Sequence, residues 1–239
     1  MTFETAVETD TGRTRDINED SAYAATGDDW CLLVVADGMG GHAAGDVASE
    51  TAIETFAEFV EPRLADGARD VAGVLTSGVR AANDRLQERI EADPSLEGMG
   101  TTLVAAVLEG DVVTVVNVGD SRGYRLIDGA IEQVTVDQSL VQQLVEQGKI
   151  TEEEARTHPQ RNVVSQALGT SDTVEPDTDE IPRKGTMLLC SDGLTEEVPD
   201  EQINEIVHDA GDLETAAVEL VTAANENGGS DNISVVLGR

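Results

Sequence analysis

The stretch CLLVVADGMGGHAAG, residues 31–45, decides the fold and the site of this chain. Its apolar run from Cys31 to Val35 predicts a buried strand, and that strand has to end at Asp37. Glycines follow at once, so the backbone can turn sharply and come close to whatever Asp37 holds. A carboxylate at the tip of a buried strand suits a hard cation, although an Asp that caps a helix or starts a turn fits the same letters.

The same combination of an acid and a glycine at a strand end recurs along the chain. TMLLCSDG contains Asp192, GGSDNISVVL contains Asp231, and NVGDSRGYRL contains Asp120. A further acidic stretch, RDINED at residues 15–20, lies near the N-terminus. One such acid predicts a turn, but their repetition predicts a shared cluster of carboxylates that could hold cations.

Taken in order, the motifs RxxNED, VADGMGG, GTT, GDSR, SDG and GGSDN resemble those of a known family. The resemblance is to the metal-dependent protein phosphatases of the PPM, or type 2C, serine/threonine family, and it is closest to the compact bacterial and archaeal members. It implies an α+β fold, a four-layer α/β/β/α sandwich with two central antiparallel sheets flanked by helix pairs. It also implies a single catalytic domain over residues 1–239, with a flap subdomain at about 137–169.

The activity that the resemblance implies is hydrolysis of phosphoserine and phosphothreonine in proteins, with a metal-activated water attacking phosphorus directly. Two divalent ions about 3.5–4 Å apart can activate a water and neutralise phosphate charge. Oxygen ligands suit Mn²⁺ or Mg²⁺. By resemblance, Asp37 bridges the two ions, the Gly38 carbonyl binds one of them, and Asp192 and Asp231 complete the first ion's site.

Other family positions extend this ligand set by resemblance. Glu19 and Asp20 match acids that reach metal-bound waters, although many bacterial members carry Gln at the Glu19 position. Asp120 matches the acid that, with Asp192, can hold a third, weaker ion in microbial members. Arg15 matches the arginine that binds the substrate phosphate, since a guanidinium grips two phosphate oxygens and keeps its charge. Arg15 therefore shares the catalytic role with Asp37.

Supporting roles are expected for a few more residues. Asn232, beside the last acid, and Thr102, in the GTT motif, are expected to hold ligands or water in place. His158 lies in the flap and is a candidate to meet substrate. Some eukaryotic relatives place a proton-donating His directly after the Asp-Gly pair, where this chain has Met39, and His42 follows only later. The identity of the general acid therefore stays open.

Hydrophobic periodicity predicts the remaining elements. Helices are expected over 43–60, 69–92, 139–147, 152–157, 200–209 and 212–226. Strands are expected over 3–9, 21–25, 102–108, 112–118, 122–126, 130–134, 186–191 and 232–237. Short strands joined by tight turns favour antiparallel sheets over alternating βαβ units.

The charge of the chain is strongly negative, with 48 acidic against 15 basic residues and a net charge of −33. Such a surface repels nucleic acid and anionic membranes, so neither is an expected partner. Acids occur in nearly every predicted loop and helix face. This spread favours adaptation to concentrated salt over steering of basic partners, and we expect a halophilic source. The expected partners are phosphorylated proteins, with a cognate Ser/Thr kinase as a candidate.

We expect a cytoplasmic monomer. The N-terminus lacks a basic segment followed by an apolar one, so no secretory signal is predicted. No apolar run approaches the ~18 residues that span a bilayer. The two cysteines, Cys31 and Cys190, lie inside apolar strand runs and are expected to be free and buried.

Three other functions fit parts of the sequence. GMGGHA formally fits a dinucleotide-binding GxGxxA turn, but Asp37 would lie beside the pyrophosphate and the next segment is another helix. A catalytically silent PPM-fold module that binds a regulator is the second, and the presence of Asp37, Asp192 and Asp231 argues against it. A small-molecule phosphomonoesterase is the third. The sequence separates it poorly from a protein phosphatase, because both would have the same metal core.

Overall fold

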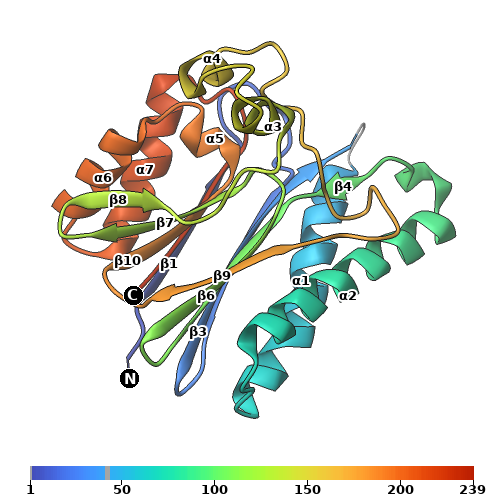
Figure 1. The fold of residues 1–239 in the computed structure, drawn as a ribbon, viewed down its shortest axis with the longest axis horizontal. Coiled ribbons are helices and arrows are strands. Elements are labelled where there is room, and N and C mark those ends of the chain that lie inside the picture. The colour runs from blue at the N-terminus through green and yellow to red at the C-terminus, as the bar shows by residue number, and fades with distance from the viewer. Residues whose placement is uncertain (1, 41–43) are drawn as a thin grey trace.

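A computed structural model gives the arrangement of the chain and describes residues 2–40 and 44–239. His42 and the predicted helix start at residue 43 lie outside these described residues. Within them, the strands form two packed antiparallel sheets, and helices cover the two outer faces (Figure 1). The predicted α/β/β/α sandwich is confirmed.

The first sheet joins the two ends of the described chain. The first strand of the chain pairs antiparallel with the last strand of the chain, so that Thr5 lies opposite Gly238 and Asp10 opposite Ile233. The first strand is thus an edge strand, as the sequence predicts. In spatial order the sheet contains β1 (Thr5–Asp10), β11 (Ile233–Gly238), β10 (Thr186–Cys190), β7 (Arg122–Ile127) and β8 (Ala130–Gln133).

The second sheet contains the strand that ends in the Asp37 motif. In spatial order it contains β2 (Asp20–Thr26), β3 (Trp30–Met39), β5 (Leu103–Glu109), β6 (Val112–Val118) and β9 (Asp177–Pro182), and β4 (Gly100–Thr101) pairs with the end of β3. The sequence did not predict β9. Its segment, DTDEIP, is mostly exposed and acidic, so it lacks the apolar alternation by which a strand is found.

Helix pairs pack on the outer faces through separate apolar cores. Helices α1 (Gly45–Ala65) and α2 (Val71–Ala92) cover the second sheet, while α6 (Asp200–Asp209) and α7 (Leu213–Asn227) cover the first. Helix α1 continues past its predicted end at residue 60, because the extra turn buries Leu64 in the same core. Two short helical turns lie outside these pairs, namely η1 (Pro94–Leu96) and α5 (Asp192–Thr195).

Between the sheets lies a third core, formed by side chains such as Cys31, Leu33, Leu189 and Val236. Cys31 and Cys190 are both free and fully buried, as predicted. None of the helices in the described part of the chain is long and apolar enough to cross a membrane.

The predicted flap contains two short helices, α3 (Leu140–Glu146) and α4 (Glu152–Arg156). Thr151 and Glu154 form a reciprocal capping box at the start of α4. A bridge from Thr101 to Leu168 ties the flap to the body, and a bridge from Ser139 to Val164 joins two segments within the flap. Figure 1 shows α3 and α4 at the opposite end of the sandwich from the two termini.

Candidate metal centre

Asp37 lies near the end of β3, and its backbone is held on both sides. The Thr102 amide and the Thr101 hydroxyl each donate to the Asp37 carbonyl at 2.9 Å, and the Asp37 amide donates to Thr102 Oγ1 at 2.9 Å. Thr102 Oγ1 also lies 2.7 Å from Ser121 Oγ. The register of β2 and β3 places Asp20 directly opposite Asp37. The GTT motif therefore fixes the strand end from which the central carboxylate projects.

Glycines let the backbone crowd beside this carboxylate. The Gly38 amide donates to the Glu19 carbonyl at 3.1 Å, and Ser49 Oγ donates to the same carbonyl at 2.6 Å. A Cβ on Gly38 would collide with the carbonyl oxygens of Gly45 and Glu19, and one on Gly45 would collide with the Glu19 carboxylate. Only glycine permits this approach, and it places Glu19 against the start of α1.

The end of β10 brings Ser191 and Asp192 to the same place as Asp20 and Asp37. Buried Ser191 donates from Oγ to Asp20 Oδ2 at 2.7 Å, and the Ser234 amide donates to Ser191 Oγ at 3.0 Å. Asp20 is thereby held through Oδ2. The next residue, Asp192, has a buried Oδ1 with no hydrogen-bond partner among the described residues. A buried acceptor left unpaired is costly, so this atom calls for a ligand.

The predicted acids lie close enough to perturb one another. Burial raises the pKa of Asp37 well above its ordinary value, and the charges of Asp20, Asp192, Asp120 and Asp231 raise it further. Burial likewise raises the pKa of Asp192, followed by the charge of Asp120. The pKa of Asp20 is raised to about 6, mainly by burial, although hydroxyl donors lower it. Crowded buried carboxylates of this kind are stabilised by a bound cation.

Asp120 lies two residues before Arg122, whose guanidinium binds a different acid. Arg122 instead holds Asp137, with Nε 2.9 Å from Oδ1 and Nη2 2.6 Å from Oδ2. Burial, and then the charge of Asp137, raise the pKa of Asp120 to about 6. Asp120 is thus an acid whose nearby arginine is already engaged, which agrees with its predicted place beside Asp192.

Arg15 lies at the mouth of the cluster. Its Nη2 is 2.7 Å from Asp231 Oδ2, its Nη1 is 3.8 Å from Glu19 Oε2, and its side chain is 46% exposed. Arg13 is exposed too, and its backbone amide donates to the Gly229 carbonyl. The guanidinium of Arg15 therefore combines contact with the acids and access to solvent.

Asn232 ties the N-terminal loop to the start of β11. Its Oδ1 accepts from the Glu19 amide at 2.8 Å, and its Nδ2 donates to the Thr11 and Ile17 carbonyls at 2.9 Å each. The side chain thus holds the segment that carries Arg15 and Glu19, which is the kind of supporting contact expected for it.

His158 closes a turn in the flap, where its Nδ1 accepts from the Gln160 amide at 3.1 Å. It is not among the described residues that line the cleft beside the acids. The structure thus gives His158 a local hydrogen bond and no contact with the site, and its meeting with substrate stays a prediction.

The residues present fit a hard divalent cation. Among the described residues, no three Asp, Glu, His or Cys side chains already form a complete cation cage, and Arg15 engages one oxygen of Asp231. The donors are nonetheless carboxylate and carbonyl oxygens, the backbone approaches closely at Gly38, and Asp192 Oδ1 lacks a partner. Oxygen-rich sets of this kind suit Mg²⁺ or Mn²⁺ once side chains adjust around the ion.

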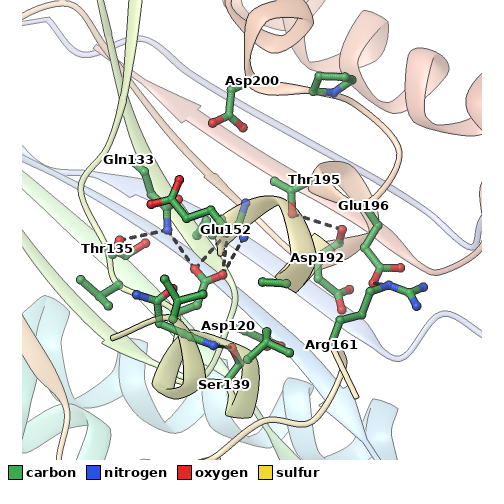
Figure 2. A pocket seen from close by; sticks show the side chains of 18 of the residues that line it. Asp120, Gln133, Thr135, Ser139, Glu152, Arg161, Asp192, Thr195, Glu196 and Asp200 are labelled. Atoms are coloured by element: carbon green, nitrogen blue, oxygen red, sulfur yellow. Dashed lines mark hydrogen bonds and ion pairs between the residues drawn. The ribbon is translucent and has the colours of Figure 1, made fainter. Parts of the chain in front are cut away.

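A cleft of about 830 Å³ opens from the acids toward the flap. Figure 2 shows Asp120 and Asp192 among its lining residues, together with Glu152 from the flap and Asp200 from the start of α6. Arg161 of the flap reaches Glu196, with Nε 3.2 Å from Oε1. The cleft gives a substrate larger than a phosphate group a path beside the cluster.

Several supporting residues were not predicted from the sequence, namely Ser191, Ser234, Ser121 and the pair of Arg122 with Asp137. Their hydroxyl groups and charges contact residues on other strands or loops, so no local pattern in the sequence reveals the contacts. The one local signal is position, because Ser191 directly precedes Asp192 and Ser121 directly follows Asp120.

Comparison with known proteins agrees with this geometry. A family model described as protein phosphatase 2C matches residues 11–237. The serine/threonine phosphatase stp of Listeria welshimeri is 41% identical over 233 residues, covering 96% of this chain and 92% of that protein. The crystal structure of the Mycobacterium tuberculosis serine/threonine phosphatase PstP/Ppp superposes with a TM-score of 0.91 and 41% identity, covering 100% of this chain and 98% of that one.

A further solved structure is the catalytic domain of serine threonine protein phosphatase PstP in complex with two manganese ions. It has a TM-score of 0.88 and 39% identity, and the match covers 99% of this chain and 97% of that one. Because the family model spans nearly the whole chain and the strand-end acids converge as the motifs predict, this chain belongs to the protein phosphatase 2C family.

Proposed function

We propose that this chain hydrolyses phosphoserine and phosphothreonine in proteins with the help of two Mn²⁺ or Mg²⁺ ions. The observation that carries the proposal is the convergence of Asp37, Asp192, Asp120 and Asp231, each from a different strand end, close enough that their charges perturb Asp37. Membership of the protein phosphatase 2C family, and relatives named as serine/threonine phosphatases, support the same activity.

The cations would be held by Asp37, the Gly38 carbonyl, Asp192 and Asp231, with Glu19 and Asp20 reaching their waters. Asp120 with Asp192 would hold a third, weaker ion. When bound, divalent ions lower the pKa of water so that it attacks phosphorus, and they neutralise charge on the phosphoryl oxygens. The chain's own part is to fix the ligands, and the hydrogen bonds from Thr101, Thr102 and Ser191 do this.

Arg15 would bind the substrate phosphate. It lies at the mouth of the acid cluster and is partly exposed, so its unengaged N–H groups can meet two phosphoryl oxygens. Its contact with Asp231 holds the guanidinium beside the cluster. Binding in this way would orient phosphorus toward the ions without forming any covalent bond to the protein.

The wider organisation follows the same proposal. Residues 1–239 would form one catalytic domain with a flap at about 137–169, and the protein would act as a cytoplasmic monomer on phosphorylated proteins. A cognate Ser/Thr kinase is the candidate partner that would supply those substrates. The charge of −33, spread over the chain, supports adaptation to concentrated salt.

The test is phosphate release from a phosphothreonine peptide by the wild type and by Asp37→Asn, with manganese and with chelator, in dilute and in multimolar potassium chloride. We expect manganese-dependent release that falls at least about 100-fold in the variant, because the proposed central ligand of both ions loses its charge. A 100-fold loss corresponds to about 2.8 kcal/mol of barrier. Asp66→Asn, which removes an exposed acid at the end of α1, is the matched control and should keep full activity.

Two outcomes would support the alternatives. No release by a folded protein that binds manganese in calorimetry would favour a silent module of the same fold. Release from small phosphate esters but not from any phosphopeptide would favour a small-molecule phosphomonoesterase.

A further inference from the structure

The cleft beside the candidate metal centre is lined by more acidic than basic side chains. It begins at Asp120 and Asp192 and continues between the flap and the start of α6, over about 830 Å³. Resting on the proposed function, we infer that this cleft receives the residues flanking the phosphorylated side chain and selects substrates that carry Lys or Arg there.

The two arginines of the cleft are already engaged by acids of the same cleft. Arg122 is gripped by Asp137 through Nε and Nη2, and it also contacts the Tyr124 hydroxyl at 3.2 Å. Arg161 pairs with Glu196 at 3.2 Å. Unlike Asp231 beside Arg15, these partner carboxylates have no proposed cation, so their charge stays available to match the guanidinium, which then attracts a further anion only weakly. The cleft therefore offers little to an acidic peptide.

Other carboxylates of the lining keep their charge unmatched. Glu152, on the first turn of α4, is exposed and makes no hydrogen bond or ion pair among the described residues. Among the residues that the structure describes, Asp200 at the start of α6 accepts only a long bond, of 3.3 Å, from the Tyr124 hydroxyl to its Oδ1. Glu197 accepts from the Ser230 amide and hydroxyl, which are neutral groups. These acids come from the flap on one side and from the α5–α6 segment on the other.

Cations that enter the cleft would meet carboxylates on both sides. Walls of low dielectric focus the field of such charges, and enclosed pairs are screened by salt less than open ones. A Lys or Arg next to the phosphoresidue would make charge-assisted hydrogen bonds there, whereas a Glu would be repelled. Acids cover the whole protein, so a preference that comes from this cleft has to persist when distant acids are removed.

The experiment compares phosphothreonine peptides that differ only in one flanking residue, Arg, Gln or Glu, placed on either side of the phosphothreonine in separate peptides. The readout is kcat/KM with manganese at fixed potassium chloride. For at least one side, we expect the Arg peptide to exceed the Glu peptide by about tenfold in the wild type. The double variant Glu152→Gln, Asp200→Asn should bring this ratio close to one.

The double variant Glu54→Gln, Glu58→Gln is the matched control. It also removes two acids, both exposed and lining a separate hollow on α1 in the outer helix layer of the other sheet, and should leave the ratio unchanged. Asp200→Asn keeps an oxygen that can accept from Tyr124, and thermal unfolding of each variant checks that the fold is retained.

An equal fall of the ratio in the α1 control and in the double variant of the cleft would overturn the inference, because general charge would then explain the preference. A preference for the Glu peptide would also overturn it and would show that Arg122 or Arg161 meets the substrate. If the wild type hydrolysed no peptide, the proposed function would fail. Fluorescence anisotropy of the same labelled peptides would then decide the inference, since binding without an Arg preference contradicts it.

Discussion

The Nη2 atom of Arg15 lies 2.7 Å from Oδ2 of Asp231, so the arginine proposed for substrate and an acid proposed for metal form one ion pair. The pair joins the N-terminal loop to the residue before Asn232 and β11, across nearly the whole length of the chain. A cation at Asp231 and a phosphate at Arg15 would therefore meet at the same point.

Arg15→Ala tests this relationship. We expect KM for a phosphothreonine peptide to rise at least about tenfold, since charged hydrogen bonds to phosphate contribute roughly 1.5–3 kcal/mol. Manganese affinity, measured by calorimetry, should not weaken, because the substitution leaves every oxygen ligand in place. Arg13→Ala, at an exposed site in the same loop, should change neither quantity. Unchanged kinetics in Arg15→Ala would remove the arginine from the phosphate site.

Ser191→Ala removes the hydroxyl that donates to Asp20 at 2.7 Å. We expect manganese affinity in calorimetry to fall roughly 10- to 100-fold, the range found when a residue that holds a metal ligand is removed. Ser95→Ala, whose hydroxyl bonds to an exposed Asp, is the control. Full affinity in Ser191→Ala would show that Asp20 needs no such support.

Gly78→Ala tests the packing of α2 on α1. The added methyl would lie 2.8 Å from Val60 Cγ2 and 3.0 Å from Phe56 Cδ2, and both of these residues are fully buried. Overpacking of this kind costs about 1–3 kcal/mol, which urea unfolding would detect as a lower midpoint. Gly211→Ala meets no atom within 4 Å and should leave the midpoint within experimental error. Equal midpoints for the two variants would contradict close helix packing.

Both thiols are expected to be inert in the folded protein. Burial raises the pKa of Cys31 and of Cys190 to about 12, so almost no thiolate forms near neutral pH. A thiol reagent at pH 8 should therefore label the native protein very slowly and label both cysteines at once in denaturant. Fast labelling of the native state would mean that the strand ends open readily.

Tyr23 makes stability fall at alkaline pH. Its hydroxyl donates to Glu61 Oε1 at 2.6 Å, and this bond, followed by burial, raises its pKa from 10.0 to about 12. Between these values the unfolded chain loses the phenolic proton while the folded one keeps it, so the free energy of unfolding decreases as pH rises. Tyr23→Phe should flatten that slope in urea titrations. An identical slope would show that the bond is not kept in solution.

Much of the fold could be predicted because its elements carry strong periodicity. Strands β3 and β5 are continuous apolar runs, and α2 repeats an apolar face, so each is visible locally. The edge strand β9 could not be found in this way. Its pairing with β6 buries little, and its register is set by a neighbour more than 50 residues away in sequence.

In the site, the acids could be predicted from repeated motifs, whereas their supports could not. Ser191 supports Asp20 only because β10 and β2 end at the same place in the folded chain. The engagement of Arg122 by Asp137, rather than by nearby Asp120, depends on where the flap leaves the first sheet. Such choices are made by tertiary packing, which single-sequence patterns do not contain.

The pairing of β1 with β11 has a consequence for synthesis on the ribosome. The first strand of the first sheet hydrogen-bonds with the last, from Thr5 with Gly238 to Asp10 with Ile233. A nascent chain that has not yet emerged beyond residue 232 leaves β1 without this neighbour, whatever the rest of the chain has done. Contacts so distant in sequence form late and slowly. The second sheet and its helices can therefore fold early, whereas the centre containing Asp231 is completed only when the last strand is released, and an interrupted chain would carry no working phosphatase.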